Sequence, residues 1–252
     1  MSFLSKTAIV TGGCGGLGAA ISKAFLDAGA NVVAIDMNRS LTQSFASTHA
    51  SPKLLVVEGD ITSEPTLDKL FSDAISKFGQ VDCLVNNAGI MDRMEPAGEL
   101  EKSAWDRVIA VNLTAPYMTS RRLAQHVMEK GHLGSIVNVS SVAGVSGYTA
   151  GASYTSSKWG LLGLTKNTAA FYSDKNLRCN AIMPGPMETH VADHLQEGYS
   201  KLGMAMQEKK RVTMGPPSPL SEVAALVLFL SSDSAKTISG STVPIDSAWS
   251  AF

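Results

Sequence analysis

A tyrosine and a lysine four residues apart, Tyr154 and Lys158, are the side chains of this chain best suited to acid–base chemistry. The i,i+4 spacing puts the phenol and the ammonium on one face of a helix. A free tyrosine has a pKa of about 10, which is too high for a base at neutral pH. A nearby lysine stabilises the phenolate, so we expect Lys158 to lower the pKa of Tyr154 and allow it to exchange protons. Such pairs also occur by chance on exposed helices, so the pair alone assigns no function.

A glycine-rich stretch, TGGCGGLG at 11–18, follows a short apolar run and opens an amphipathic segment. Glycines let the backbone approach a pyrophosphate, which the free N–H groups at a helix N-terminus then bind. The stretch fits two spacings, Gly13-x-Gly15-x-x-Gly18 and Gly12-x-x-x-Gly16-x-Gly18. A flexible turn without a ligand is the alternative, but the position between a strand and a helix favours a dinucleotide-binding loop.

Asp36 stands 18 residues after Gly18, at the end of the second apolar run. A carboxylate there hydrogen-bonds the adenosine ribose of NAD and repels the 2′-phosphate of NADP. Cys14 occupies a place in the glycine loop that could have carried a basic residue, whereas Arg39, three residues beyond Asp36, could soften the repulsion. An aspartate that caps the next turn is the simpler alternative. The sequence favours NAD over NADP.

These residues need a scaffold of alternating strands and helices. Short β-branched runs at 8–10, 32–35, 54–57, 83–85 and 136–139 lack polar alternation, as expected for parallel strands buried on both faces. Helical patterns separate them; one begins at Ser63, carries Pro65 in its first turn and stops at Gly79. The alternation predicts a single domain over 1–252, a doubly wound, Rossmann-like α/β fold with helices on both faces of a parallel sheet.

Composition excludes several classes of partner. The 252 residues include 21 Lys and Arg against 22 Asp and Glu, and the formal net charge of -1 favours neither nucleic acid nor an anionic membrane. The longest apolar run, 223–230, is far shorter than the ~20 residues of a membrane span. The chain enters a strand-like run at once, so we expect no signal peptide and a cytoplasmic location.

Metal ligands are sparse. Cys14, Cys83 and Cys179 have no CxxC spacing, so we expect reduced thiols rather than a disulfide or a zinc site. His190 and His194 are spaced i,i+4 but have no glutamate between them to act as a general base. We therefore expect no metal ion.

Together these features resemble the short-chain dehydrogenase/reductase family, in its compact single-domain form, over nearly the whole chain. The matching pieces occur in the family's order: Thr11-Gly12-x-x-x-Gly16-x-Gly18, Asp60-Ile61, Asn86-Asn87-Ala88-Gly89, Asn112, Ser140-Ser141, Tyr154-x-x-x-Lys158, Asn180 and Pro184-Gly185. The resemblance implies a Rossmann-like fold, a nicotinamide cofactor and oxidoreductase activity.

The resemblance implies four catalytic residues. Tyr154 would exchange a proton with the substrate oxygen, and Lys158 would tune Tyr154 and bind the nicotinamide ribose. Ser141, 13 residues before the tyrosine, would hold the substrate oxygen. Asn112 is similar to an asparagine that interrupts a helix and anchors a water relay to the lysine, and Pro116 fits an irregular helix there.

The resemblance also implies the residues that line the cofactor cleft. These are Gly12, Gly16, Leu17, Gly18, Asp36, Asp60, Ile61, Asn87, Ala88, Gly89, Tyr154, Lys158, Pro184, Gly185, Met187 and Thr189. The simpler alternative for Asn86 and Asn180 is a structural role, bridging strands or loops through side-chain hydrogen bonds, and Ser140 could be a bystander.

The chain departs from the family near its C-terminus, where Asp246 is followed by Ser247 and Ala248 instead of a glycine pair. Losing glycine removes backbone freedom at a turn, so we expect the tail to run differently. In the family this region often packs between subunits, so the departure bears on the implied homo-oligomer, a tetramer or a dimer.

The segment 184–219 is rich in Pro, Gly and Met, and predicts an irregular substrate lid. Methionine suits an irregular apolar ligand, although the same residues could fill a loop core. Met91, Tyr148 and Trp159 lie close to the active-site motifs in sequence, which favours a bulky or apolar substrate over a small sugar or polyol.

The leading hypothesis is an NAD-dependent secondary alcohol dehydrogenase, equally a ketone reductase in the reverse direction, with a small-molecule substrate. An NADP-dependent 3-oxoacyl-thioester or ketone reductase is the alternative, and Asp36 and Cys14 speak against it. A non-catalytic dinucleotide-binding protein ranks last, because such relatives typically lose the tyrosine or the lysine.

Overall fold

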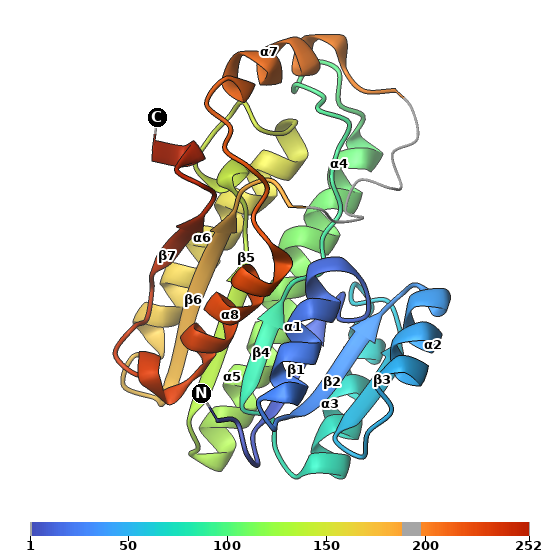
Figure 1. Ribbon diagram of the computed structural model, residues 1–252, viewed down its shortest axis with the longest axis vertical. Helices are drawn as coiled ribbons and strands as arrows, with labels where there is room; N and C mark the ends of the chain where they lie inside the picture. Colours follow the sequence, from blue (N-terminus) through green and yellow to red (C-terminus); the bar gives the residue numbers. More distant parts are fainter. Residues whose placement is uncertain (1, 188–197, 252) are drawn as a thin grey trace.

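The computed structural model describes residues 2–187 and 198–251, in which parallel strands form one sheet ordered β3-β2-β1-β4-β5-β6-β7 (Figure 1). The strands are β1 Thr7–Thr11, β2 Asn31–Asp36, β3 Leu54–Glu58, β4 Cys83–Asn86, β5 Gly134–Val139, β6 Leu177–Pro184 and β7 Thr242–Ile245. The strand order reverses between β1 and β4, and open α/β sheets bind ligands at such a switch point. The predicted doubly wound, Rossmann-like single domain is confirmed.

Helices cover both faces of the sheet. The longer ones are α1 Gly16–Asp27, α2 Arg39–Thr48, α3 Glu64–Phe78, α4 Lys102–Ile109, α5 Ala115–Lys130, α6 Ala152–Phe171, α7 Lys201–Arg211 and α8 Leu220–Ser231. Short irregular turns complete the chain: η1 Ala110–Thr114, η2 Val142–Gly144, η3 Asp233–Ala235 and η4 Trp249–Ala251. In Figure 1, α1 and α8 lie in front of the sheet and α5 and α6 behind it.

Successive residues of a central strand pack into two separate hydrophobic cores, one on each face of the sheet. Ile9 packs in one core with Leu67 of α3 and other side chains of α3 and α5. The next residue, Val10, packs in the opposite core with Ile21 of α1 and Val227 of α8. Because both faces of each central strand are buried, apolar residues are needed at every position, which explains the missing polar alternation.

The ends of α3 follow the sequence signals. The Ser63 hydroxyl accepts a hydrogen bond from the Thr66 amide at 3.4 Å, Pro65 lies in the first turn, and Gly79 ends the helix with φ of 88°. This capping fixes where the loop after β3 passes into α3, at the carboxyl edge of the sheet.

The C-terminal turn forms without glycine. Ser247 and Ala248 adopt φ of 52° and 67°, the left-handed region that glycine would favour. The Ser247 hydroxyl donates to the Pro216 carbonyl at 3.2 Å, and the Asp246 carboxylate accepts from the Ser250 amide at 2.8 Å. These hydrogen bonds hold two strained residues in place.

Cys14, Cys83 and Cys179 are buried free thiols. Within 2–187 and 198–251, no group of three or more His, Cys, Asp or Glu side chains could hold a metal ion. None of the helices in those same ranges is both long and apolar enough to cross a bilayer. His190 and His194 lie outside the described residues.

Candidate active site

A cleft of about 560 Å³ opens at the carboxyl edge of the sheet, over the switch point between β1 and β4. Thirteen of the sequence-predicted cofactor residues line its wall: Gly12, Gly16, Leu17, Gly18, Asp36, Asp60, Ile61, Asn87, Ala88, Gly89, Tyr154, Lys158 and Met187. One cleft therefore holds both the glycine loop and the tyrosine–lysine pair.

The glycine loop has the shape of a phosphate cradle. Gly12 has φ of 59°. A Cβ on Gly18 would lie 1.8 Å from the Gly12 carbonyl oxygen, so any side chain at position 18 would clash with the backbone of this tight turn. The Asn87 amide nitrogen donates to the carbonyls of Thr11 at 2.9 Å and Gly12 at 3.1 Å, fixing the loop against β4. Gly15 caps α1 without a side-chain hydrogen bond, which leaves the N–H groups of the first turn to a ligand. This chemistry fits the pyrophosphate of a dinucleotide.

Asp36 ends β2 beside that loop. Its carboxylate accepts from the Cys14 amide at 3.4 Å and the Asn38 amide at 3.0 Å, so it also braces the following turn. Arg39 lies 3.9 Å from the Glu58 carboxylate, and both side chains are exposed. Arg39 thus has a carboxylate partner other than Asp36.

The loop after β3 forms the next part of the wall. The Asp60 carboxylate accepts from both the amide and the hydroxyl of Thr62 at 2.8 Å. Ile61 is buried beside it. The carboxylate therefore shapes the loop, and Thr62 itself reaches the cleft.

Tyr154 packs near the start of α6 in an apolar cluster that includes Ala143 and Met91. The pKa of Tyr154 is raised to about 12: burial raises it most, a hydrogen bond from Ser141 lowers it in part, and the Asp92 carboxylate adds to the rise. The expected net lowering of the Tyr154 pKa is therefore wrong, because desolvation of the phenolate outweighs the effects that favour ionisation. At neutral pH Tyr154 is therefore a phenol, suited to donating a proton.

Lys158 extends beside the tyrosine, with its Nζ 5.4 Å from the centroid of the Tyr154 ring. The ammonium donates to the Val139 carbonyl at 2.9 Å, at the end of β5. Burial lowers the pKa of Lys158 to about 8. The partner is a neutral carbonyl, so the positive charge remains available to a ligand.

Asn112 lies in η1, a π-helical turn between α4 and α5, which agrees with the predicted irregular helix. Its side chain accepts from the Ile90 amide and donates to the Ile90 carbonyl, both at 2.9 Å, and donates to the Ser157 hydroxyl at 3.2 Å. Pro116 follows in the first turn of α5. Such π turns cluster at functional sites because they re-aim a side chain.

The two neighbouring serines divide their roles. The Ser140 hydroxyl donates to the Lys158 carbonyl at 3.1 Å and so holds α6. The Ser141 hydroxyl hydrogen-bonds Tyr154 and accepts from the Ala143 amide at 3.1 Å. This arrangement supports Ser141 as the serine that works with the tyrosine.

Some predicted residues lie apart from the cleft wall. Gly185 donates its amide to the Ile245 carbonyl at 3.0 Å and packs against Asp246. Pro184, just before it, is buried at the end of β6. Thr189 lies outside the described residues.

Asn86 and Asn180 make structural hydrogen bonds that bridge strands and loops, in agreement with the simpler of the two interpretations of these residues. The Asn86 amide donates to the Asn138 side chain at 2.8 Å, bridging β4 and β5. The Asn180 amide donates to the Ile238 carbonyl at 2.8 Å and its oxygen accepts from the Ser241 amide at 3.1 Å.

The predicted lid is partly regular. Residues 201–211 form α7 instead of an irregular loop, because Lys, Leu, Met, Ala, Gln and Glu are good helix formers. The helix lies beyond the carboxyl edge of the sheet, at the top of Figure 1. Met187 lines the cleft, and residues 188–197 lie outside the described part of the chain.

Sequence reasoning missed several residues of the cleft. Met37 and Gly59 follow β2 and β3, and Val139 ends β5, so their places at the carboxyl ends of strands were a usable signal. Leu41, Ile90 and Arg107 also line the cleft. They lie in helices or loops, and no local pattern marks them.

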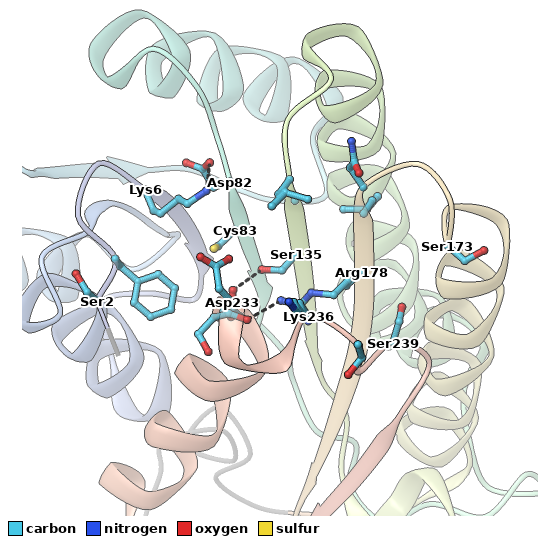
Figure 2. Close-up of a pocket in the computed structure, with 18 of the residues that line it drawn as sticks. Ser2, Lys6, Asp82, Cys83, Ser135, Ser173, Arg178, Asp233, Lys236 and Ser239 are labelled. Carbon is cyan, nitrogen blue, oxygen red and sulfur yellow. Dashed lines mark hydrogen bonds and ion pairs between the residues drawn. The ribbon is translucent and has the colours of Figure 1, made fainter.

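A second hollow, of about 530 Å³, lies at the amino edge of the sheet (Figure 2). Lys6 faces the buried carboxylate of Asp82 at 3.3 Å. The Arg178 guanidinium donates to the Leu230 carbonyl at 2.7 Å and the Ser232 carbonyl at 3.2 Å, at the end of α8. These charges are satisfied by the protein itself.

Comparison with known proteins agrees with this geometry. A family model described as short chain dehydrogenase matches residues 6–200. The short chain dehydrogenase/reductase dpchG of Colletotrichum higginsianum is 42% identical over 250 residues, covering 97% of this chain and 93% of the relative. The 3beta-hydroxysteroid dehydrogenase 2 of Eggerthella lenta is 36% identical over 249 residues, covering 98% and 95%.

A solved structure extends the similarity to three dimensions. The crystal structure of levodione reductase superposes with a TM-score of 0.88 at 28% identity and covers 99% of each chain. Fold, motif order and sequence similarity agree over nearly the whole length. The chain belongs to the short-chain dehydrogenase/reductase family of oxidoreductases.

Proposed function

We propose that this oxidoreductase transfers a hydride between NAD(H) and a secondary alcohol or ketone. The observation that carries the proposal is the cleft itself, in which the glycine loop and Asp36 lie at one end and Tyr154 and Lys158 at the other. A dinucleotide that places its phosphates on the loop would bring its nicotinamide to the tyrosine.

The choice of NAD rests on Asp36 and its surroundings. A carboxylate at this point accepts hydrogen bonds from ribose hydroxyls and repels a 2′-phosphate. Arg39 lies near Glu58, and Cys14, at a place in the loop that could carry a basic residue, has no positive charge in any ionisation state. Both features favour NAD over NADP.

The side chains around Tyr154 have separable roles. When bound, the nicotinamide supplies or accepts the hydride. Tyr154 donates its phenolic proton to the substrate oxygen in reduction and receives one in oxidation, while Ser141 orients that oxygen. Lys158 stabilises the phenolate by its charge, and Asn112 holds the loop at Ile90 against α6.

The substrate we propose is bulky and apolar. Val145 is 41% exposed and Tyr148 53% exposed, and both lie in the segment between Ser141 and Tyr154. Met204, on α7, is 44% exposed. The Eggerthella lenta relative is named for a 3beta-hydroxysteroid, a ring alcohol of this chemical class.

The first experiment compares NAD and NADP binding to the purified protein by calorimetry, with Asp36→Ala alongside. Tight NAD binding that weakens in Asp36→Ala supports the proposal, and NADP preference would favour the reductase alternative instead. Asp174→Asn changes an exposed aspartate at the amino edge and serves as a charge-matched control. A panel of steroid and cyclic secondary alcohols then tests turnover, and failure of NAD to support oxidation of any of them would contradict the substrate class.

We also propose self-association through α5 and α6. Tyr117 and Met128 on α5 are about half exposed, Trp159 on α6 is 53% exposed and Phe171 is 74% exposed. Large apolar side chains of this kind mark interaction surfaces when they gather on one region. Sedimentation equilibrium of wild type and Trp159→Glu tests this, with a dimer or tetramer expected for wild type and a smaller species for the variant.

A further inference from the structure

The helix that carries Tyr154 has no capping residue of its own. α6 begins after Gly151, whose position offers no side-chain cap, and its first turn contains no acidic residue. Tyr154 is the third residue of the helix, so its amide is one of the N–H groups that a helix cannot satisfy internally. A residue from elsewhere must accept these hydrogen bonds.

Asp92, in the loop after β4, supplies that cap from 62 positions away. One carboxylate oxygen accepts from the Gly151 amide at 2.9 Å and the Met94 amide at 3.1 Å. The other accepts from the Tyr154 amide at 2.8 Å and the Ser153 hydroxyl at 3.0 Å. The side chain is buried, and its negative charge meets the positive end of the α6 dipole.

The same loop connects to the other parts of the site. Both backbone groups of Ile90 pair with the Asn112 side chain. The Glu95 carbonyl accepts from the Ala152 amide at 2.8 Å, a second link to the start of α6. Residues 90–95 therefore bind Asn112 at one end and the first turn of α6 at the other.

The loop also contacts α7. The Ser200 amide donates to the Arg93 carbonyl at 2.9 Å, just before this helix. A Cβ on Gly203 would lie 1.9 Å from the Met94 carbonyl oxygen, so α7 packs directly on the loop backbone. The position of the tyrosine and that of α7 thus depend on one short segment.

We propose that Asp92 is a positioning residue, whose carboxylate caps α6 from outside the helix and so fixes Tyr154 for proton transfer. This inference rests on the proposed function, because it assigns Tyr154 the proton. The negative charge of Asp92 opposes ionisation of the phenol. Lys158 lies on the same ring, with its Nζ 5.4 Å from the centroid, and a positive charge at that distance acts in the opposite direction.

Asp82 offers a matched control at the opposite edge of the sheet. It is also a buried aspartate, and its carboxylate accepts from the Thr7 amide at 2.8 Å, the Gln80 side chain at 2.7 Å and the Lys6 ammonium at 3.3 Å. Asp92→Asn and Asp82→Asn therefore remove similar charges from similar buried sites. Only the first change touches Tyr154.

The kinetic test uses the alcohol or ketone that wild type turns over best in the screen above. Asp92→Asn is expected to lower kcat by roughly 10- to 100-fold, because a small misplacement of a reacting group has effects of that size. KM and NAD affinity should change little, and the limb of the pH profile that reports Tyr154 should move to lower pH. Ser153→Ala, which removes one hydrogen bond but keeps the carboxylate, should leave that limb in place.

The second readout needs no substrate. Ring ¹³C NMR of labelled tyrosine identifies Tyr154 as the signal absent from Tyr154→Phe, and its shift at alkaline pH reports the ionised fraction. Asp92→Asn should show at least about a threefold larger ionised fraction than wild type, as loss of one nearby buried charge predicts. Asp82→Asn should match wild type.

Equal ionised fractions in Asp92→Asn and Asp82→Asn would overturn the inference, as would an unchanged kcat and pH profile in a folded Asp92→Asn protein. A wild-type protein that oxidises none of the panel with NAD would instead count against the proposed substrate class. The NMR comparison would still decide the role of Asp92 in that case. The two failures are therefore distinguishable.

Discussion

The two edges of the sheet carry hollows of nearly equal volume, about 560 Å³ at the carboxyl edge and about 530 Å³ at the amino edge. Each has a lysine and a buried aspartate close by. At the amino edge Lys6 and Asp82 pair with each other at 3.3 Å. At the carboxyl edge Lys158 donates to a neutral carbonyl, and Asp92 caps a helix. At the amino edge the lysine and the aspartate satisfy each other. At the carboxyl edge the protein satisfies Asp92, but the positive charge of Lys158 faces only a neutral carbonyl and remains available to a ligand.

Helix direction reinforces this difference. The N-termini of α1 and α6 point to the carboxyl edge, where their partial positive charge favours anions. The C-terminus of α8 lies at the amino edge, where the guanidinium of Arg178 meets its last carbonyls. The parallel fold therefore prepares one edge for phosphate and oxyanion chemistry and closes the other with its own cations.

The largest expected effect follows Tyr154→Phe, which removes the acid–base group from the carboxyl edge. Loss of the phenolic proton should lower kcat by about 10²- to 10⁴-fold, the usual range for an acid–base group. NAD affinity, measured by calorimetry, should stay within about twofold because the ring remains. Tyr172→Phe, at the other end of α6, is the control and should retain turnover. Normal turnover in Tyr154→Phe would remove the tyrosine from the mechanism.

Lysine substitutions at the two edges should shift stability in opposite directions. Burial lowers the pKa of Lys158 from 10.5 to about 8, which corresponds to about 3 kcal/mol against the folded state at neutral pH. Lys158→Met should therefore raise the free energy of unfolding by up to ~3 kcal/mol while abolishing turnover. Lys6→Met should lower it by about 1 kcal/mol, because it leaves the buried Asp82 with one partner fewer.

Urea unfolding at several pH values checks the assignment to Lys158. Between pH 8 and 10.5 the unfolded chain holds the lysine proton that the folded chain has lost, so wild-type stability gains from rising pH there. Lys158→Met lacks this gain, and the difference between the two proteins should shrink from pH 7.5 to 9.5. A constant difference would mean that the buried ammonium is not its cause.

The strained C-terminal turn at the carboxyl edge should respond to glycine. Ser247→Gly and Ala248→Gly should each raise the free energy of unfolding by about 1 kcal/mol, because they relieve positive φ angles of 52° and 67°. Asn176, at the amino edge, has φ of 61°, but asparagine tolerates this region. Asn176→Gly should therefore raise the free energy of unfolding by only ~0.3 kcal/mol. Equal effects at the three sites, measured by urea unfolding, would contradict the strain.

The smallest expected effect is an acid sensitivity at the amino edge. Burial lowers the pKa of His126 below 6.5, helped by the positive charges of His132 and Lys130, and its ring accepts a hydrogen bond from the Val81 amide at 3.2 Å. The unfolded chain binds the proton more readily than the folded chain does. The contribution of neutral His126 to the free energy of unfolding is therefore fully present above pH 6.5 and is lost as pH falls. His126→Gln should flatten the loss of stability between pH 7 and 5.5, and an unchanged slope would exclude His126.

Local signals predicted the frame of the molecule. The glycine loop lies between a strand and a helix in the sequence itself, and Ser63 and Gly79 mark both ends of α3. The role of Asp92 was not predictable, because its partner amides lie about 60 residues away and depend on tertiary packing. The pKa of Tyr154 was mispredicted for a related reason: spacing along a helix specifies a neighbour but says nothing of burial. The left-handed turn at Ser247 carries no glycine signal at all.

The π-helical turn at Ala110–Thr114 makes the number of residues in this helix as important as their identity. Such a turn holds one residue more than a regular α-helix would need. Deleting one residue of the turn other than Asn112 would allow α4 and α5 to run on as a single regular helix, because five π-helical and four α-helical residues turn through nearly the same angle. The flanking helices would keep their register, and Asn112 would lose the displaced position that the wider turn gives it. Turnover should then fall although Asn112 is retained, because its side chain would no longer reach Ile90 and Ser157. The length of this turn is therefore constrained separately from the identities of its residues.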